Sequence, residues 1–459
     1  GGAQPAPDSA FGSLELVAAT VVQGGNVQVP WGHVQLGGRK FNADVAGRVD
    51  LLAGSVTSVS GAGLQLPFGG TVDGVGWRRN GADFDVLGPG SNNIPIGIDI
   101  VSNAFNGVAG SVLDMSGGGE LSGAAFVAGR GGSVDILRHA LADANPRYRF
   151  SGSDNAVYAI MPGRSGTQAP QALADGSADP RAGQQIVIPA GVPGLPAGTY
   201  TLLPASYALQ KGAFRVEVGA ESAVGSRQPV ATGTGSWRVS GHQAQSLGGG
   251  VSSLLTDLVL TPADVVRRHA SYNETSYSAF VQGVAERRGE ALRWRPTDAG
   301  NLNLVLGDGA GRSSVPAAIF QGVSRFNAGS NDGRGGTLSV NLLASNEAML
   351  EIATQGVSAG SGSGATLFDS ALNAFRPETM LIGGVLRRDA TTYSLEGSAQ
   401  HIVVRNGVTL TAQEVLLSAA FGGKGILVEQ GASIDTLAAA DPSRVAQPTA
   451  PYLVSGGLL

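Results

Sequence analysis

Cysteine is absent from this chain of 459 residues, and charged residues account for only 14% of it. Without thiols, neither a disulfide bond nor a thiolate metal site can form. Lysine is limited to Lys40, Lys211 and Lys424, and the net charge of −5 is spread along the chain without a basic stripe. A protein that binds nucleic acid needs such a stripe to neutralise phosphates, so the sequence does not favour that function.

Long hydrophobic runs and clustered histidines are missing as well. No apolar run reaches the roughly 18 residues that a membrane-spanning helix needs, so no such helix is predicted. The five histidines are scattered singly, without the spacing of a zinc site: His33, His139, His242, His269 and His401. Runs of Asn, Asp and Gly at 307–313 and 329–336 each occur once and are interpreted as tight turns. We therefore predict no catalytic residue, no metal site and no cofactor.

Glycine and apolar residues are abundant instead, with 71 glycines and a hydrophobic share of 42%. Disordered chains are poor in apolar residues, so this composition indicates a folded core. Val27 and Val29, and then Val34 and Leu36, alternate with other residues at a period of two. This period is typical of half-buried strands. The sequence therefore predicts an all-β protein of short strands joined by glycine turns.

Two spacings suggest that these strands repeat along the chain. The segment "GSVLDMSGG" begins at Gly110 and is echoed by "GSVDIL" at Gly132, 22 residues later. Apolar triplets that start at Ile402 and Ile426 lie 24 residues apart. A coil of a parallel β-helix takes roughly 20 to 25 residues, within the range of solenoid repeats. The spacings predict a solenoid in which each coil pairs with the one before it.

The middle of the chain breaks this rhythm. A helix is predicted over 261–272, with Thr261 as N-cap and Pro262 in the first turn, and a second helix over 278–289. The segments 161–183 and 225–250 are rich in Gly and Pro and are predicted to be loops. The predicted organisation is therefore β-helix coils over 1–140, an irregular insertion with short helices over 141–296, and further coils over 297–459.

One stretch of this middle part, "VPGLPAGTYTLLPASYALQKGAFRV" at 192–216, is unlike its repetitive surroundings. Its prolines stand beside glycines and predict two successive turns. Tyr200, Tyr207 and Phe214 are spaced by seven residues and would supply the large apolar contacts that a glycine-rich region lacks. A carbohydrate-stacking surface made of the same three rings is the alternative interpretation.

Four segments together carry a family resemblance: 192–216 above, "GSVLDMSGGGELSGAAFVAGRGGSVDIL" at 110–137, "DNAVYAIMPG" at 154–163 and "YNETSYSAF" at 272–280. Their combination and order resemble a signature of very large bacterial exoproteins of the filamentous haemagglutinin family. The resemblance implies a right-handed parallel β-helix in the secreted partner of a two-partner secretion system, exported through an outer-membrane β-barrel transporter.

The resemblance also implies a role and a location. Such proteins are secreted or held at the bacterial cell surface, and they act in adhesion to host or neighbouring cells or their glycans, in cell–cell contact or in biofilm. This chain begins with Gly-Gly and lacks the N-terminal secretion domain of the family, so we expect it to be an interior or C-terminal segment. The predicted function is that of a non-enzymatic structural or adhesive exoprotein segment.

An enzymatic alternative follows from the predicted fold, because parallel β-helices also host polysaccharide lyases and glycosidases with clustered carboxylates. Asp114 and Asp135 are 21 residues apart, about one coil, and on stacked strands they would lie about 5 Å apart. The same spacing also arises when a repeat replicates a polar turn position. The alternative function is therefore a β-helical carbohydrate-active enzyme.

Both ends of the sequence look strand-like and apolar. "GSLELVAAT" at 12–20 and "PYLVSGGLL" at 451–459 contain little charge, and neither resembles the polar cap that closes a solenoid. We therefore expect the segment to continue into further coils or to associate end to end with other copies.

Overall fold

The computed structural model describes most of the chain. The described residues are 7, 9–39, 46–79, 82–84, 96–129, 132–163, 181–226, 228–244, 250–307, 316–343, 349–355, 364–388, 392–436, 452–455 and 457–458. They are mainly strands, several of them in parallel sheets, and the predicted all-β class is confirmed. The chain forms two compact units: unit 1 comprises 1–65, 85–120 and 281–459, and unit 2 comprises 66–84 and 121–280.

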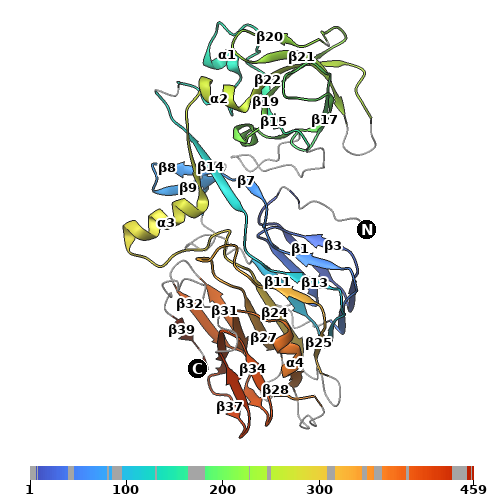
Figure 1. The fold of residues 1–459 in the computed structure, drawn as a ribbon, viewed down its shortest axis with the longest axis vertical. Helices are drawn as coiled ribbons and strands as arrows, with labels where there is room; N and C mark the ends of the chain where they lie inside the picture. Colours follow the sequence, from blue (N-terminus) through green and yellow to red (C-terminus); the bar gives the residue numbers. More distant parts are fainter. Residues whose placement is uncertain are drawn as a thin grey trace. The chain divides into compact units, whose positions relative to one another are not determined.

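Unit 1 contains three parallel sheets that the chain visits in the same order four times. Several of their strands can be followed in Figure 1. Sheet A is the longest of these sheets. Its strands are β1 (Ser13–Val17), β4 (His33–Gly37), β11 (Gly97–Val101), β24 (Asn301–Gly307), β27 (Thr337–Leu343), β30 (Thr379–Ile382) and β35 (Glu414–Leu417). Sheet B contains β2 (Thr20–Gln23), β5 (Arg48–Leu51), β12 (Phe105–Gly107) and β25 (Ala318–Phe320), and sheet C contains β3 (Asn26–Gln28), β6 (Val56–Ser58), β13 (Val112–Asp114) and β26 (Val323–Arg325).

A fourth parallel sheet, sheet D, adjoins sheet B, since the N–H of Ala317 donates to the carbonyl oxygen of Thr366 at 2.8 Å. Its strands are β29 (Gly364–Phe368), β28 (Met349–Ala353), β33 (His401–Val404) and β37 (Gly425–Val428). Beside it lie helix α4 (Asp369–Ala374) and the parallel pair β34 (Thr409–Thr411) and β38 (Ser433–Asp435). The remaining strands are the hairpin β31 (Gly384–Arg388) and β32 (Tyr393–Gly397) with β39 (Tyr452–Ser455), and the pair β36 (Ala419–Ala420) and β40 (Gly457–Leu458).

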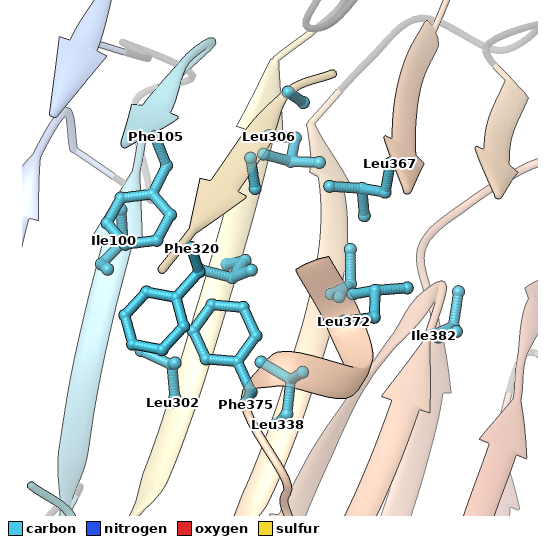
Figure 2. Packing of buried hydrophobic residues seen from close by; sticks show 14 of the residues in the cluster. Ile100, Phe105, Leu302, Leu306, Phe320, Leu338, Leu367, Leu372, Phe375 and Ile382 are labelled. Atoms are coloured by element: carbon cyan, nitrogen blue, oxygen red, sulfur yellow. The ribbon is translucent and has the colours of Figure 1, made fainter. Parts of the chain in front are cut away.

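The core of unit 1 lies between these sheets, because alternate residues of each strand point inward. Inward residues of neighbouring strands in sheet A lie next to one another. For example, Ile100 is paired with Leu36 on one side and with Leu304 on the other. Phe320 and Phe375 stack with ring centroids 4.3 Å apart, and Figure 2 shows both rings among the aliphatic side chains of the cluster. The predicted inward packing of alternate valine and leucine positions is confirmed.

Unit 2 is built around an antiparallel sheet. Its order is β17 (Gly198–Thr201), β16 (Gln185–Ile188), β21 (Trp237–Ala244), β22 (Leu255–Pro262), β19 (Phe214–Ser222), β15 (Ala156–Ile160) and β18 (Leu203–Pro204), with β20 (Val230–Ala231) on β21. The two outermost strands, β17 and β18, are separated in the chain by Leu202 alone, so the sheet closes on itself as a barrel. Buried side chains such as Ile186, Val216 and Leu258 fill its interior.

Short elements complete unit 2. They are β8 (Gly70–Val72), β9 (Gly76–Arg79), β10 (Ala82–Asp83), α1 (Leu141–Ala144), the 3₁₀ turn η1 (Ala205–Leu209), α2 (Ala263–His269), β23 (Tyr272–Ser276), and most of β7 (Gln65–Pro67) and β14 (Glu120–Phe126). Helix α3 (Tyr277–Arg288) begins in unit 2 and ends in unit 1. No described helix is long and apolar enough to cross a membrane.

The middle of the chain differs from the sequence expectation in two respects. The segment predicted to be a loop at 225–250 contains β20 and β21. Both predicted helices exist as α2 and α3. Thr261 is not the N-cap of α2, because its hydroxyl pairs with that of Ser236 at 2.9 Å while Pro262 occupies the cap position.

Candidate functional site

The two aspartates considered as a catalytic pair lie in different units. Asp114 is on β13, where its neighbours on the adjacent strands are Ser58 and Arg325, and it forms an ion pair with Arg325 at 3.3 Å. Asp135 belongs to unit 2 and accepts hydrogen bonds from the Tyr272 hydroxyl at 2.9 Å and from the N–H of Leu137 at 3.0 Å. The stacking on which the enzymatic alternative depended is not found for these two carboxylates, because the chain leaves the parallel sheets after β13 and the 21-residue spacing does not span a coil.

The most concentrated group of charges in unit 2 is centred on β19. Arg215 and Glu217 alternate along the strand with Phe214, Val216 and Val218, which point into the barrel, so both charges point out of it. Each side chain is nevertheless 0% exposed, and Nη1 of Arg215 donates to Oε1 of Glu217 at 2.7 Å. A buried ion pair of this kind is stable only when its remaining polar atoms also find partners.

Those partners come from the segment between Ile136 and Asn155. The Glu217 carboxylate accepts hydrogen bonds from the N–H of Leu141 at 2.7 Å, the Ser151 hydroxyl at 2.6 Å and the Asn155 amide at 3.1 Å. Arg215 in turn donates to the carbonyl oxygens of Ile136, at 2.6 Å, and His139, at 2.8 Å. We name the ion pair with these five contacts the β19 clamp, because it fastens this segment to the barrel wall.

Burial also shifts the titration of groups beside the clamp. It lowers the pKa of His269, and the nearby Arg215 guanidinium lowers it further. It raises the pKa of Tyr272, with the Asp135 carboxylate acting in the same direction. Arg215 itself has a lowered pKa because of its burial, which the Glu217 carboxylate opposes. The guanidinium group of an arginine keeps its proton in proteins at neutral pH. A substrate cannot contact an ion pair that has no solvent exposure, so the β19 clamp has a structural role.

A second buried carboxylate lies in sheet D of unit 1. Glu351 on β28 accepts hydrogen bonds from the Thr366 hydroxyl at 2.9 Å and from Nε of Arg405 at 2.6 Å, and Nη1 of the same arginine reaches Glu429 at 2.7 Å. The pKa of Glu429 is lowered, first by the N–H of Asn406 and then by Arg405. A general acid needs a carboxyl group that holds its proton near neutral pH. Two carboxylates that share one guanidinium instead tie neighbouring strands together.

The aromatic residues of the unusual stretch at 192–216 lie inside unit 2. Tyr200 and Phe214 belong to the barrel core, and Tyr207 is buried beside Leu203. The first predicted turn is present at Val192–Leu195, where the N–H of Leu195 donates to the carbonyl oxygen of Val192 and Gly194 adopts a positive φ of 77°. The packing interpretation of the three rings is therefore confirmed, and a carbohydrate-stacking surface made of them is excluded.

The described histidines do not gather into a metal site. His33 contacts an acidic residue: its Nε2 lies 3.2 Å from Asp99 on the neighbouring strand of sheet A. Among the described residues, no group of three or more His, Asp or Glu side chains could hold a metal ion.

Apolar side chains are exposed at the two outer edges of the parallel sheets in unit 1. Leu16 on β1 and Val22 on β2 lie at one edge and are 37% and 58% exposed. Val428 on β37 and Ile434 on β38 lie at the opposite edge and are 46% and 43% exposed. Exposed apolar side chains on edge strands are a feature of interaction surfaces.

Comparison of the chain with protein-family models, with curated proteins and with solved structures gave no match.

Sequence reasoning had not identified the β19 clamp, although a signal for it was present. In the run Phe214–Val218, apolar and charged residues alternate, which places both charges on one face of a strand. The hydrogen-bonding partners lie about 60 to 80 residues earlier in the chain, and no local pattern connects them to β19.

Proposed function

We propose that this chain is a non-enzymatic structural or adhesive segment of a secreted bacterial exoprotein, with unit 1 forming a right-handed parallel β-helix. The observation that carries the proposal is the recurring order of sheets A, B and C, which the chain visits four times with parallel pairing at each return. A β-helix has this order by construction. Right-handedness is the general preference of crossovers between parallel strands.

The charged groups of the described residues support a structural role. Asp114, Glu351 and Glu429 each form an ion pair with an arginine. A glycosidase requires two carboxyl groups that face one sugar ring, one of which keeps its proton. The pKa of Glu429 is lowered by the N–H of Asn406 and by Arg405, which makes this carboxyl group a poor proton donor.

The resemblance to the filamentous haemagglutinin family supports a location outside the cell for this role. It rests on the four segments around 110–137, 154–163, 192–216 and 272–280. On this basis the protein is exported through an outer-membrane β-barrel transporter and acts outside the cell, where it contacts host or neighbouring cells, their glycans or a biofilm matrix.

Binding and turnover measurements on the same preparation test this function. The chain is incubated with bacterial and host cells and with a glycan array, and we expect saturable retention on at least one of these surfaces. In parallel, it is incubated with a panel of acidic and neutral polysaccharides, and we expect no release of reducing ends. Chain cleavage that disappears in the Glu351→Gln or Glu429→Gln variant would establish the carbohydrate-active enzyme instead. A lack of retention on every surface would refute the adhesive role.

A further inference from the structure

The hairpin of β9 and β10 in unit 2 carries two adjacent arginines on opposite faces. In the paired register, Arg79 lies opposite Ala82 and Arg78 lies opposite Asp83. Successive residues of a strand point to opposite faces of a sheet. Arg78 therefore shares a face with Asp83, and its Nε forms an exposed ion pair with that carboxylate at 2.7 Å. Arg79 points to the other face, where β9 and β10 place no acidic side chain.

An aromatic ring lies beneath the guanidinium group of Arg79. The Cζ atom is 4.0 Å from the centroid of the Phe68 ring, which is a cation–π contact. The half-buried Phe84 packs edge-on against Phe68, with ring centroids 4.8 Å apart. Its N–H donates to the carbonyl oxygen of Trp77 at 2.8 Å, so Phe84 lies opposite Trp77 and on the face of Arg79. This face combines one cation with an apolar aromatic flank.

Arg79 differs from the other described arginines that are buried or half-buried. Each of those forms an ion pair with a carboxylate: Arg215, Arg293, Arg295, Arg334 and Arg405. Within the described part of the chain, the Arg79 side chain has neither an ion pair nor a hydrogen bond. Burial lowers its pKa, and the electrostatic interaction with Tyr207 opposes this shift. Since an arginine keeps its proton at neutral pH, a partly desolvated cation is left without a counter-charge.

We propose that Arg79 is the anion-binding residue of a ligand site on unit 2, and that its ligand is the carboxylate of an acidic sugar. The inference rests on the proposed function, because a glycan at a cell surface or in a biofilm matrix supplies that carboxylate. The planar guanidinium group donates two parallel N–H groups to one carboxylate. The cation–π contact restricts this group before the ligand arrives, which reduces the entropy cost of binding.

The surroundings of Arg79 favour a singly charged ligand that carries a ring. A phosphate monoester has a charge of about −1.5 to −2 at pH 7, whereas this face of the hairpin offers one cation. Arg78 adds nothing to it, because it points away and already pairs with Asp83. A sugar carboxylate has a single charge, and the C–H groups of its ring pack against an aromatic side chain such as Phe84.

Titration calorimetry of the full chain tests the site. Glucuronate is the probe, and glucose is its uncharged counterpart. We expect the native chain to bind glucuronate and to bind glucose at least tenfold more weakly. Arg79→Gln is expected to weaken glucuronate binding about tenfold or more, because a charged pair of hydrogen bonds is lost. Arg78→Gln is the matched control, since it removes the adjacent arginine from the opposite face and should leave the affinity unchanged.

A second variant separates the loss of the ligand contact from a loss of folding. Arg79→Lys keeps the charge without the planar fork, so its affinity for glucuronate should lie between those of the native and Arg79→Gln chains. Circular dichroism and urea unfolding verify that each variant is folded. Equal affinities of the native, Arg79→Gln and Arg78→Gln chains would overturn the proposal, as would a native chain that does not bind glucuronate.

Two further ligands define the chemistry of the site. Glucose 6-sulfate carries a sulfate on the same kind of ring, and acetate carries the carboxylate without a ring. Both are expected to bind more weakly than glucuronate. Equal binding of the sulfate would overturn the choice of a carboxylate, and equal binding of acetate would overturn the choice of a sugar.

The outcome is distinct from that of the proposed function, because retention on cells and glycans is measured independently. If the native and Arg79→Gln chains are retained equally and bind glucuronate equally, the Arg79 site is refuted and the adhesive role stands. If the chain binds glucuronate through Arg79 but is retained on no surface, the adhesive role is refuted and the site stands.

Discussion

Arg215 and Glu217 form an ion pair of 2.7 Å on one strand of the barrel in unit 2, and neither side chain is exposed to solvent. A segment that lies 60 to 80 residues earlier in the chain supplies the other hydrogen bonds of the pair. The ion pair therefore joins β19 to a segment that lies far from it in the sequence. The stability of this connection depends on the presence of both charges.

Removing one member of this pair is expected to destabilise unit 2 strongly. Arg215→Ala leaves the Glu217 carboxylate buried without its counter-charge, and breaking a buried pair in this way costs about 3–5 kcal/mol. Urea unfolding measures the change. The matched control is Arg238→Ala, which breaks the exposed pair between Arg238 and Asp257 of the same sheet, and a surface pair contributes about 0–1 kcal/mol. Equal losses in the two variants would contradict the structural role of the β19 clamp.

Acid is expected to weaken unit 2 through His269. The pKa of His269 is lowered in the folded chain, mainly by burial and further by the charge of Arg215. Between this lowered pKa and the ordinary value of about 6.5, the unfolded chain therefore binds more protons than the folded chain does. The contribution of neutral His269 to stability is therefore fully present above pH 6.5 and declines as the pH falls below that value. His269→Leu should reduce the slope of unfolding free energy against pH over this window. An unchanged slope would show that another group controls it.

Some of the architecture could be predicted from the sequence because the pattern that carries it is local. Ile402 and Ile426, which the sequence places 24 residues apart, face each other on β33 and β37. The similar spacing of Gly110 and Gly132 was misleading, because Gly110 precedes β13 whereas Gly132 belongs to unit 2. A periodic spacing signals a coil only when the chain between the two positions stays in the parallel sheets.

The barrel of unit 2 could not be predicted in the same way. Its closure depends on strands that pair across long distances, such as β15 with β19, and on the bend at Leu202 that lets one stretch of chain form both outer strands. The glycine-rich composition of 225–250 resembled a loop, yet β21 there is supported by the apolar strand β22. Tertiary pairing overrode local propensity.

The stacked phenylalanines of unit 1 are expected to contribute strongly to its stability. Phe320 is 4% exposed and stacks with both Phe105 and Phe375, at centroid distances of 6.2 and 4.3 Å (Figure 2). Replacing a buried phenylalanine by alanine costs about 3–5 kcal/mol, because it leaves a cavity. Phe421→Ala is the control, since Phe421 is 77% exposed. Thermal unfolding should show a clear loss for Phe320→Ala and little change for Phe421→Ala; similar melting temperatures would argue against a continuous core.

Trp31 sets a limit on the size of the residue at position 61. The indole is 2% exposed, and its Nε1 donates to the carbonyl oxygen of Gly118 at 3.1 Å, which fixes the ring in place. A Cβ at Gly61 would lie 2.0 Å from the ring, so a Gly61→Ala variant must displace the tryptophan and lose its hydrogen bond. Overpacking of this kind costs about 1–3 kcal/mol.

The Gly61→Ala prediction has a control of the same chemistry. At Gly76 an added Cβ meets no atom within 4 Å and the backbone does not have a positive φ, so Gly76→Ala introduces the same methyl group without a clash. Since alanine also restricts the unfolded chain more than glycine does, Gly76→Ala should be neutral or slightly stabilising. Gly61→Ala should instead lower the midpoint of urea unfolding and change the fluorescence of Trp31. If both variants unfold at the midpoint of the native chain, the close packing of Trp31 against Gly61 is not a feature of the folded protein.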